Sequence, residues 1–303
     1  RVLRLPRTSL KRHSPSSLQL MKKRKIAFQS SDGLRLVGIL EDPPETDGMT
    51  QSPDMVLFLH GLYQHKNVSF LREFGSRIPA DVKFLSAFRG GLSTFRFDCR
   101  GLGESEGKTV YAPHLNHLRD LESAITFLER DMKRRVVSIL GYSAGGNVAL
   151  LAASHPRFKH VRNIAMISSR FEMSGIRNTL TEDEKRCLLN NGDPIEFEFS
   201  KRGKKQSIRI GYPDLMQFES IDNVKFCAQL SRRTRVFLCH GTADTRVPIR
   251  DLDSFESNLK HKCHTTKVLI PNANHGYDDK NARELLYQTW RDWMIMSSSF
   301  SKY

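Results

Sequence analysis

The chain has 303 residues, with 48 Lys and Arg against 33 Asp and Glu, so its formal net charge is +15 at pH 7. Its hydrophobic content of 39% is typical of a globular protein, and its length suits one large domain with a small insertion. No apolar run approaches the ~20 residues of a membrane-spanning helix, and no apolar stretch near the N-terminus has the pattern of a signal-peptide core. The composition therefore argues against a membrane-spanning or secreted class.

Positive charge is concentrated at the N-terminus. Residues 1–31 hold nine Lys and Arg and no acid, whereas the rest of the chain has 39 basic and 33 acidic residues, a net charge of +6. We therefore predict that residues 1–24 form a basic arm outside the folded core. An acid-free, Arg- and Ser-rich arm is typical of a targeting segment for mitochondria or plastids. Two other interpretations stay open, namely contact with an acidic partner or membrane surface, and a solvated terminal tail.

The cysteine pattern indicates a reducing compartment. The chain has five cysteines, an odd number, and no C-x-x-C motif, so neither a disulfide framework nor a cysteine-based metal site is expected. This pattern predicts an intracellular protein, with the cytoplasm as the first choice and an organelle as the alternative. Cys99 and Cys239 lie in or at the ends of apolar runs, where a free cysteine behaves as a small hydrophobe.

The N-terminal part of the chain predicts a hairpin followed by strands and a helix. Apolar and polar residues alternate from Lys25 to Leu40 around a turn at residues 31–33, which is typical of an edge β-hairpin. Residues 41–53 are rich in Pro, Asp, Gly and Ser and predict a loop. The elements predicted after this loop are a buried strand at 55–59, a helix at 67–80 and a strand at 92–97.

Residues 113–133 predict an amphipathic helix. Five apolar residues are expected on one stripe of it: Leu115, Leu118, Leu121, Ile125 and Leu128. A strand at 136–140, a small-residue helix at 146–153 and a strand at 161–167 follow. This alternation predicts an α/β fold with a mostly parallel central sheet and helices on both faces. In such sheets active sites lie at the carboxyl ends of the strands.

The predicted core consists of residues 25–168 and 235–297, and residues 169–234 between them are predicted to form a small cap over the active site. Within this cap, alternating residues at 195–199 and 208–210 flank a basic, Gly-containing segment and predict a β-hairpin. Residues 181–190 before the hairpin and 213–219 after it have helical character. The basic hairpin tip is interpreted as a solvated turn.

Ser143 has the sequence context of a nucleophile. It lies in Gly-Tyr-Ser-Ala-Gly, directly after the apolar strand at 136–140 and directly before a helix. The glycines two positions before and after it allow a tight turn in which a side chain would clash. Such a turn holds the hydroxyl at the end of a strand, beside a helix N-terminus that favours negative charge.

Two partners for this serine follow later in the chain. Asp244 comes after the apolar strand at 236–239, and His275 comes after the apolar run at 267–270. The order Ser, Asp, His is that of α/β-hydrolases and differs from the orders of chymotrypsin and subtilisin. The sequence therefore predicts a catalytic triad of Ser143, Asp244 and His275.

Several other residues compete for these roles. His60 and His240 each precede a glycine at a strand end and are interpreted as packed structural histidines. Asp251 and Asp253 lie where a helix begins and are interpreted as capping or surface acids.

Asp98 and Arg100 follow the strand at 92–97 and are interpreted as structural. The aspartate is expected to order the next turn, and the arginine is expected to pair with an acid.

These motifs resemble those of serine hydrolases of the α/β-hydrolase superfamily. The resemblance is to the serine-aminopeptidase-like hydrolases, the cinnamoyl (feruloyl) esterases and uncharacterised plant and fungal esterase/lipase-like proteins. It runs from about Lys25 to about Trp293. The matching segments are His60-Gly61, Phe95–Gly107, Gly141–Gly146, His240–Asp244 and Asn274–Gly276. The resemblance implies an α/β-hydrolase fold with a small cap.

The resemblance also carries over site residues. The backbone N–H groups of Leu62 and Ala144 are expected to form the oxyanion hole, each stabilising the developing charge by about 3 kcal/mol. Gly61 and Tyr142 are expected at the substrate, with Tyr142 standing where many relatives have His.

By the same analogy, the expected activity is hydrolysis of a small carboxylic ester with a short, medium-length or aromatic acyl group. No metal, nucleotide or redox cofactor and no nucleic acid partner is expected. Thioesterase, acylglycerol lipase and aminopeptidase activities use the same triad and remain alternatives. A peptidase is less favoured, because Glu182, Asp183 and Glu184 predict a polar surface helix and not a site for an amino terminus. An alternative of another class is a non-catalytic scaffold that docks through its basic arm.

Overall fold

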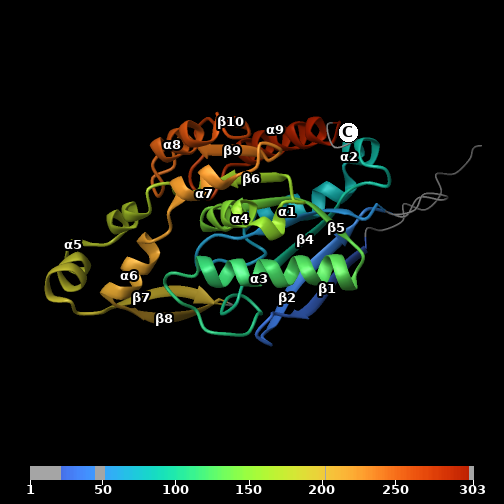
Figure 1. Ribbon diagram of the computed structural model, residues 1–303. Helices are drawn as coiled ribbons and strands as arrows, with labels where there is room; N and C mark the ends of the chain where they lie inside the picture. The colour runs from blue at the N-terminus through green and yellow to red at the C-terminus, as the bar shows by residue number, and fades with distance from the viewer. Residues whose placement is uncertain (1–21, 45–51, 202, 300–303) are drawn as a thin grey trace, which may run out of the picture.

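A computed structural model describes residues 22–44, 52–201 and 203–299 of the chain (Figure 1). Most of the predicted basic arm, residues 1–21, lies outside the described residues. The described residues form an eight-stranded sheet in the order β1-β2-β4-β3-β5-β6-β9-β10. Its strands are β1 (Lys22–Gln29), β2 (Arg35–Asp42), β3 (Asp54–Leu59), β4 (Ser93–Asp98), β5 (Arg135–Tyr142), β6 (Asn163–Ile167), β9 (Arg235–Gly241) and β10 (His264–Ile270).

The predicted N-terminal hairpin is present at the edge of the sheet. Strands β1 and β2 pair antiparallel, β2 pairs antiparallel with β4, and the remaining pairs are parallel. Strand β1 begins at Lys22, three residues before the predicted core boundary at Lys25. The reason is electrostatic as well as geometric, because Arg24 continues the pairing with β2 and donates a hydrogen bond to Asp42 at 2.9 Å.

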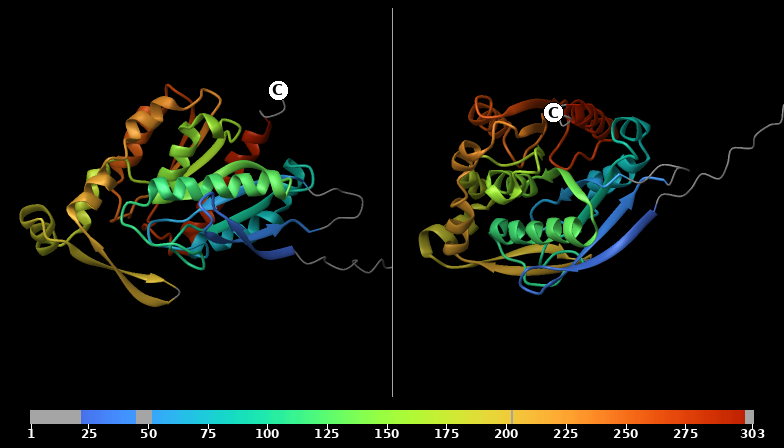
Figure 2. Two further views of the ribbon diagram at one scale, coloured as in Figure 1. Left: turned by 60° about the horizontal axis from the view of Figure 1, so that its bottom comes forward. Right: turned by 45° about the vertical axis from the view of Figure 1, so that its right-hand side comes forward.

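Helices cover both faces of this sheet, as the alternating elements predict (Figure 2). They are α1 (Ser69–Arg77), α2 (Val82–Ala87), α3 (His114–Thr126), α4 (Ala144–Ser154), α8 (Arg250–Leu259) and α9 (Lys280–Ser299). Strand β3 shows the division of the core, because Met55, Leu57 and Leu59 pack with α3, α4 and α8, whereas Val56 and Phe58 pack with α1, α2 and α9. The sequence of β3 is a continuous apolar run from Met55 to Leu59 because both faces of this strand are buried. This arrangement is the α/β-hydrolase fold.

Helix α3 differs from its predicted pattern at its first turn. Leu121, Ile125 and, in the π-helical turn Phe127–Asp131 that follows, Leu128 are buried, but Leu115 is 51% exposed. The first turn of α3 instead buries His114, whose ring packs edge-on against Phe218 at 4.9 Å. At this end of α3 the side chain that packs on the segment between β6 and β9 is His114. The apolar stripe of the helix therefore does not extend to Leu115.

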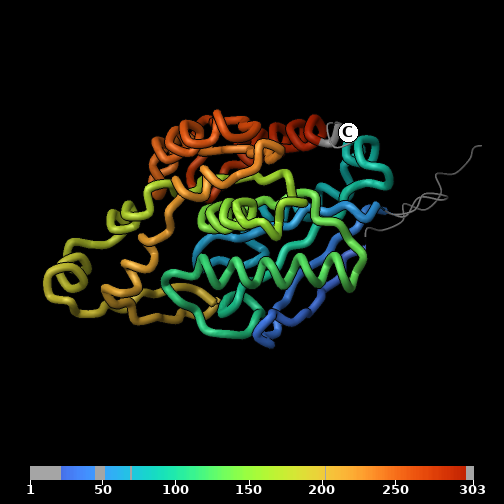
Figure 3. The backbone as a smooth tube through the Cα atoms, in the orientation of Figure 1, coloured from blue at the N-terminus to red at the C-terminus, as the bar shows by residue number. Residues whose placement is uncertain are grey.

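The segment between β6 and β9 leaves the core and returns to it (Figure 3). Its elements are η4 (Met173–Thr179), α5 (Glu182–Lys185), η5 (Arg186–Asn191), β7 (Ile195–Lys201), β8 (Lys204–Ile210), α6 (Tyr212–Glu219) and α7 (Asn223–Gln229). The predicted hairpin is β7–β8, which pairs antiparallel. The sequence missed η4 and α7. Helix α7 packs on α4 and contributes the buried Cys227 to the core.

Charged groups buried beside the sheet order the loop after β4. Asp98 accepts hydrogen bonds from the Lys66 and Glu104 backbone N–H groups at 2.7 and 2.8 Å, and a side chain at Gly103 would overlap its carboxylate. Arg100 pairs with the fully buried Asp120 at 2.7 Å and with Asp32 at 2.7 Å. These contacts confirm that Asp98 orders the turn and that Arg100 pairs with acids.

Arg100→Met is expected to destabilise the fold strongly. Burial raises the pKa of Asp120, and the Arg100 hydrogen bonds counter that effect. The substitution leaves a buried carboxylate without its partner, which costs about 3–5 kcal/mol. Urea-induced unfolding measures the loss. The matched control is Arg130→Met, which removes an exposed pair with Asp131 at 3.0 Å and should cost less than about 1 kcal/mol. Equal losses in the two variants would contradict this account of Arg100.

Candidate active site

Ser143 lies in a strained turn between β5 and α4. Its backbone has φ 53° and ψ −122°, in the region that side chains other than glycine rarely adopt. Its N–H donates to the Ile167 carbonyl of β6 at 2.8 Å, and its carbonyl accepts from the Gly146 N–H at 2.9 Å. The turn is therefore held from the neighbouring strand and from the helix that it starts.

The glycines around Ser143 are required by close backbone contacts. A Cβ at Gly141 would overlap the carbonyl oxygen of Gly145, and a Cβ at Gly145 would lie 2.5 Å from the carbonyl oxygen of Leu59 in β3. Strands β3 and β5 and helix α4 thus approach one another too closely for any side chain at these positions.

The three predicted catalytic residues meet at the carboxyl ends of their strands. His275, in the loop after β10, has Nε2 3.1 Å from the Ser143 Oγ and Nδ1 2.7 Å from the Asp244 Oδ2. Because the carboxylate can only accept, Nδ1 carries the imidazole proton and Nε2 accepts from the serine hydroxyl. Asp244, in the loop after β9, is thereby linked through His275 to Ser143.

The environment of Asp244 favours its ionised form. Burial alone would raise its pKa, but hydrogen bonds from His240 and His275 and from the Val247 N–H hold the pKa well below its usual range. Its Oδ1 accepts from the Arg246 and Val247 backbone N–H groups at 2.9 and 3.0 Å. A carboxylate held this way remains charged and fixed in orientation.

The two competing histidines lie beside these residues, and neither stands between Ser143 and Asp244, which His275 links. His60 Nε2 accepts from the Cys99 N–H at 3.1 Å, so its Nδ1 donates to the Gly61 carbonyl at 2.9 Å. Burial lowers the pKa of His60, which keeps this ring neutral. His240 is buried, with Nε2 2.9 Å from the Val247 carbonyl and 3.3 Å from the Asp244 Oδ2. Both rings order loops around the site.

The residues of the two predicted oxyanion donors, Leu62 and Ala144, line the same cavity as Ser143. Ala144 is the first residue of α4, so its N–H has no partner within the helix. Leu62 lies in the loop after β3, next to Tyr63, whose φ is +56°. The oxyanion role of the Leu62 and Ala144 N–H groups stays a prediction.

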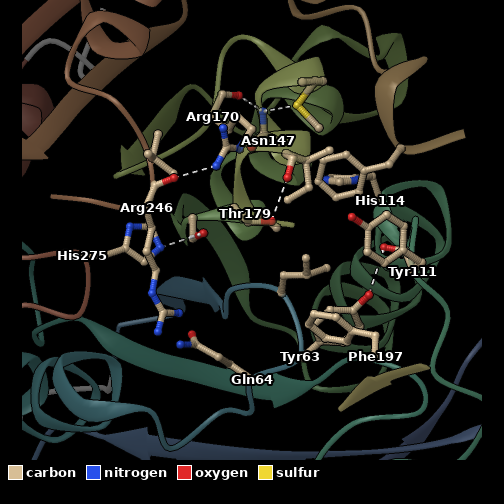
Figure 4. Close-up of a pocket in the computed structure, with 17 residues that line it drawn as sticks. Tyr63, Gln64, Tyr111, His114, Asn147, Arg170, Thr179, Phe197, Arg246 and His275 are labelled. Carbon is tan, nitrogen blue, oxygen red and sulfur yellow. Dashed lines mark hydrogen bonds between the residues drawn. The ribbon is translucent and has the colours of Figure 1, made fainter. Parts of the chain in front are cut away.

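The cavity in front of Ser143 has a volume of about 370 Å³ and lies between the core loops and the cap (Figure 4). His275 lies at one side of it, and Tyr111, His114 and Phe197 lie at the other. Apolar and aromatic residues make up about half of its lining, and polar or charged residues make up the rest. The lining residues are Leu62, Tyr63, Gln64, Tyr111, His114, Ser143, Ala144, Asn147, Arg170, Met173, Ile176, Thr179, Phe197, Phe218, Arg246, Val247 and His275.

Two predicted substrate contacts are corrected by the structure. Tyr142 and Gly61 do not line the cavity. Tyr142 is 2% exposed and lies behind the triad, where its hydroxyl donates to the His275 carbonyl at 2.9 Å and its ring packs on Phe70 at 5.0 Å. Gly61 lies against the back of Ser143, because a Cβ there would be 3.2 Å from the Ser143 Cβ. Both residues lie behind the nucleophile and outside the lining of the cavity.

Asp251 is a third correction, because it is not a surface or capping acid. It is 2% exposed, and its Oδ2 accepts from the Phe171 N–H at 2.9 Å, which ties α8 to the loop after β6. Asp253 is exposed, as predicted, and pairs with Lys267 at 2.7 Å.

Most of the cavity wall was missed by the sequence. Asn147 had a usable signal, because it lies in the first turn of the helix that begins directly after Ser143. Phe197 lies on the predicted hairpin. Tyr63, Tyr111 and Arg170 lie in loops, which have no periodic sequence pattern. Only the folded chain brings them together in the cavity wall.

Known proteins share part of this sequence. The sequence model of the serine aminopeptidase, S33, family matches residues 51–181. The uncharacterised protein YfhR of Salmonella typhi, and its counterpart in Salmonella typhimurium, are 25% identical over 187 residues, or 61% of this chain. The match spans 55% of the length of each of these relatives.

Solved structures share the fold at low sequence identity. Est1E from Butyrivibrio proteoclasticus with ferulic acid bound is 19% identical, with a TM-score of 0.70 over 90% of this chain and 99% of that one. The esterase domain of a Rhodothermus marinus protein is 21% identical, with a TM-score of 0.63 over 91% and 99%. The Pyrococcus furiosus esterase Pf2001 is 18% identical, with a TM-score of 0.60 over 91% of each chain. The chain has the α/β-hydrolase fold and resembles the serine-aminopeptidase-like and feruloyl-esterase-like groups.

Gly141→Ala is expected to disrupt the turn that carries Ser143. The added Cβ meets backbone, which cannot move without displacing α4, so a loss of about 4 kcal/mol or more in unfolding free energy is expected. Urea-induced unfolding tests this. Gly211→Ala is the control, since its nearest neighbour is the Pro213 Cδ at 3.4 Å and its φ is −104°, and it should shift stability by less than about 1 kcal/mol. A Gly141→Ala protein as stable as this control would refute the close-contact argument.

Proposed function

We propose that the protein is a serine hydrolase that cleaves carboxylic esters through an acyl-enzyme. The observation that carries the proposal is the hydrogen-bond chain from Ser143 through His275 to Asp244, with distances of 3.1 and 2.7 Å. Each distance lies within the range for nucleophile, base and orienting acid. The hydrolase family match over residues 51–181 agrees with this activity.

The first half of the proposed reaction acylates the enzyme. His275 Nε2 takes the proton of the Ser143 hydroxyl as its Oγ attacks the ester carbonyl carbon. Asp244 holds the imidazole in the required tautomer and stabilises the imidazolium. The Leu62 and Ala144 N–H groups bind the oxyanion. As the carbon–oxygen bond breaks, His275 gives its proton to the leaving alcohol.

The second half releases the acid. His275 removes a proton from a water molecule, whose oxygen attacks the acyl carbon. The tetrahedral intermediate uses the same two N–H donors. Its collapse returns the proton from His275 to the Ser143 Oγ and frees the carboxylic acid. The starting state of all three residues is thereby restored.

The cavity supports an ester with a short, medium-length or aromatic acyl group. Its aromatic and aliphatic lining suits apolar groups. The solved structure of Est1E contains ferulic acid, which makes aromatic acids a natural part of the substrate panel. The described residues that line the cavity include no Asp or Glu to pair with a peptide amino terminus, and this disfavours an aminopeptidase. Thioesters and acylglycerols remain in the panel because the same steps cleave them.

The segment 169–234 is proposed to act as a cap, and the compartment is proposed to be reducing. This segment contributes Arg170, Met173, Ile176, Thr179, Phe197 and Phe218 to the cavity wall. All five cysteines are free, which agrees with an intracellular location. No described helix is long and apolar enough to cross a membrane.

Loss of the nucleophile or of the orienting acid should each abolish most turnover. Ser143→Ala is expected to lower kcat by about 10⁶-fold, and Asp244→Asn by roughly 10⁴-fold because the wrong imidazole tautomer results. Hydrolysis of a p-nitrophenyl ester measures both. Asp253→Asn, a change of the same chemistry on the exposed face of α8, is the control and should retain activity. Turnover near the wild-type rate in either triad variant would show that the assignment is wrong.

The decisive experiment for the proposed function is labelling by a fluorophosphonate probe, with Ser143→Ala beside the wild type. Labelling that disappears in the variant, together with ester hydrolysis, supports a working serine hydrolase. A p-nitrophenyl ester series of increasing chain length then gives the size of the acyl group that fits. A folded wild type that neither labels nor hydrolyses any ester would favour the non-catalytic scaffold instead.

A further inference from the structure

The described lining of the cavity carries positively charged but no negatively charged side chains. Two of its lining residues, Arg170 and Arg246, are cations, and no described lining residue is an acid. Arg246 is exposed, whereas Arg170 is only 8% exposed. A buried guanidinium at a substrate cavity acts through a lower dielectric than a surface group, so its charge has a stronger effect on what binds.

Arg170 differs from the other buried arginines that the structure describes. Arg96 pairs with Glu41, and Arg100 pairs with Asp120 and Asp32. Within the described residues, Arg170 has no carboxylate at ion-pair distance, and its guanidinium hydrogen bond goes from Nη2 to the Arg246 carbonyl oxygen at 2.7 Å. Burying a cation in this way is costly unless a partner compensates it.

The charges near Arg170 act from further away. Burial lowers the pKa of its guanidinium, and Asp251 and Asp244 counter this effect through space. The Asp251 carboxylate accepts a hydrogen bond from the Phe171 N–H, and the Asp244 carboxylate accepts one from His275 Nδ1. Neither acid therefore neutralises Arg170 directly, and an arginine stays protonated at neutral pH.

The position of Arg170 is fixed by the fold. Its carbonyl accepts from the Asn147 and Asn223 side-chain amides at 2.7 and 3.1 Å, which anchors the loop after β6 to α4 and α7. A Cβ at Gly175 in the cap would lie 2.7 Å from the Arg170 Nη1, so the glycine leaves room for the guanidinium. Figure 4 shows Arg170 in the cavity wall beside Asn147 and the Arg246 carbonyl. Such a preorganised donor loses little entropy on binding.

We propose that Arg170 binds an anionic oxygen group of the substrate, a carboxylate or a phosphate, so that the preferred substrates are esters that carry a negative charge in addition to the scissile bond. The inference rests on the proposed esterase function and specifies its substrate class. The guanidinium offers parallel N–H donors to a planar or tetrahedral oxyanion. Arg246 at the exposed side adds attraction of the same sign.

The experiment compares kcat/KM for charged and neutral esters of the same length. One series pairs monomethyl esters of linear dicarboxylic acids with their dimethyl esters, which places the charge on the acyl side. A second pairs butanoyl esters of hydroxyalkanoic acids with those of the matching hydroxyamides, which places it on the alcohol side. A third pairs butanoyl esters of phosphorylated diols with those of the free diols. Hydrogen bonds to a charged group predict about a 10- to 100-fold preference for the charged member in at least one series.

Variants show whether Arg170 causes that preference. Arg170→Met is expected to abolish it, and Arg170→Lys, which keeps the charge without the fork, is expected to keep part of it. Arg177→Met is the matched control, because Arg177 is a cap arginine outside the cavity that pairs with Glu219 at 2.6 Å. It should leave the ratio unchanged. If Arg170→Met does not fold, Gly175→Ala displaces the guanidinium and should lower the ratio.

The possible outcomes separate this inference from the proposed function. A wild type that labels with fluorophosphonate and hydrolyses neutral esters, but prefers the charged member in none of the three series, overturns the role of Arg170. A preference that survives in Arg170→Met overturns it as well and would indicate a purely structural tie to the Arg246 carbonyl. Absence of labelling and of any hydrolysis would instead refute the esterase function itself.

Discussion

The site depends on one steric constraint, the close approach of β3, β5 and α4 around Ser143. Glycines at 141 and 145 let the backbones meet, and the turn between them forces Ser143 to a φ of 53°. The strain is held by the hydrogen bond from the Ser143 N–H to the carbonyl of Ile167 in β6. Because the parallel sheet is buried on both faces, these strands cannot shift to relieve it. The serine hydroxyl therefore lies at the carboxyl ends of the strands, beside the loops that carry Asp244 and His275.

A second set of contacts, the hydrogen bonds around Asp244 and His275, fixes the charge and orientation of these two side chains. Asp244 receives backbone N–H groups and imidazole donors, which keep it ionised and oriented toward His275. Tyr142 holds the His275 carbonyl from behind, and His60 holds the Gly61 loop next to Ser143. Neither Tyr142 nor His60 lines the cavity. Their role is to fix geometry, which matters because a base and a nucleophile act only within hydrogen-bond distance.

Residues of the segment 169–234 and of the core loops together form the wall of the cavity in front of the serine. Phe197 and Phe218 from the cap face Tyr63 and Tyr111 from the core, and their rings lie between 4.8 and 6.3 Å apart in the pairs that contact. This wall favours apolar groups. Arg170 gives the same cavity a buried positive charge with no ion-pair partner among the described residues. A substrate that satisfies both features has an apolar body and an anionic oxygen group.

The sequence by itself determined the α/β fold, the edge hairpin, the cap hairpin and the three residues that meet at Ser143. Local signals were sufficient there, because periodicity, glycine spacing and strand ends are written along the chain. The cavity wall, the exposed Leu115, the buried Asp251 and the supporting role of Tyr142 were decided only by the tertiary structure. Each depends on which segments far apart in sequence pack together: His114 on Phe218, Asp251 on Phe171, and Tyr142 on Phe70 and His275. No local pattern encodes such contacts, since side-chain burial and partners follow from the arrangement of whole elements in space.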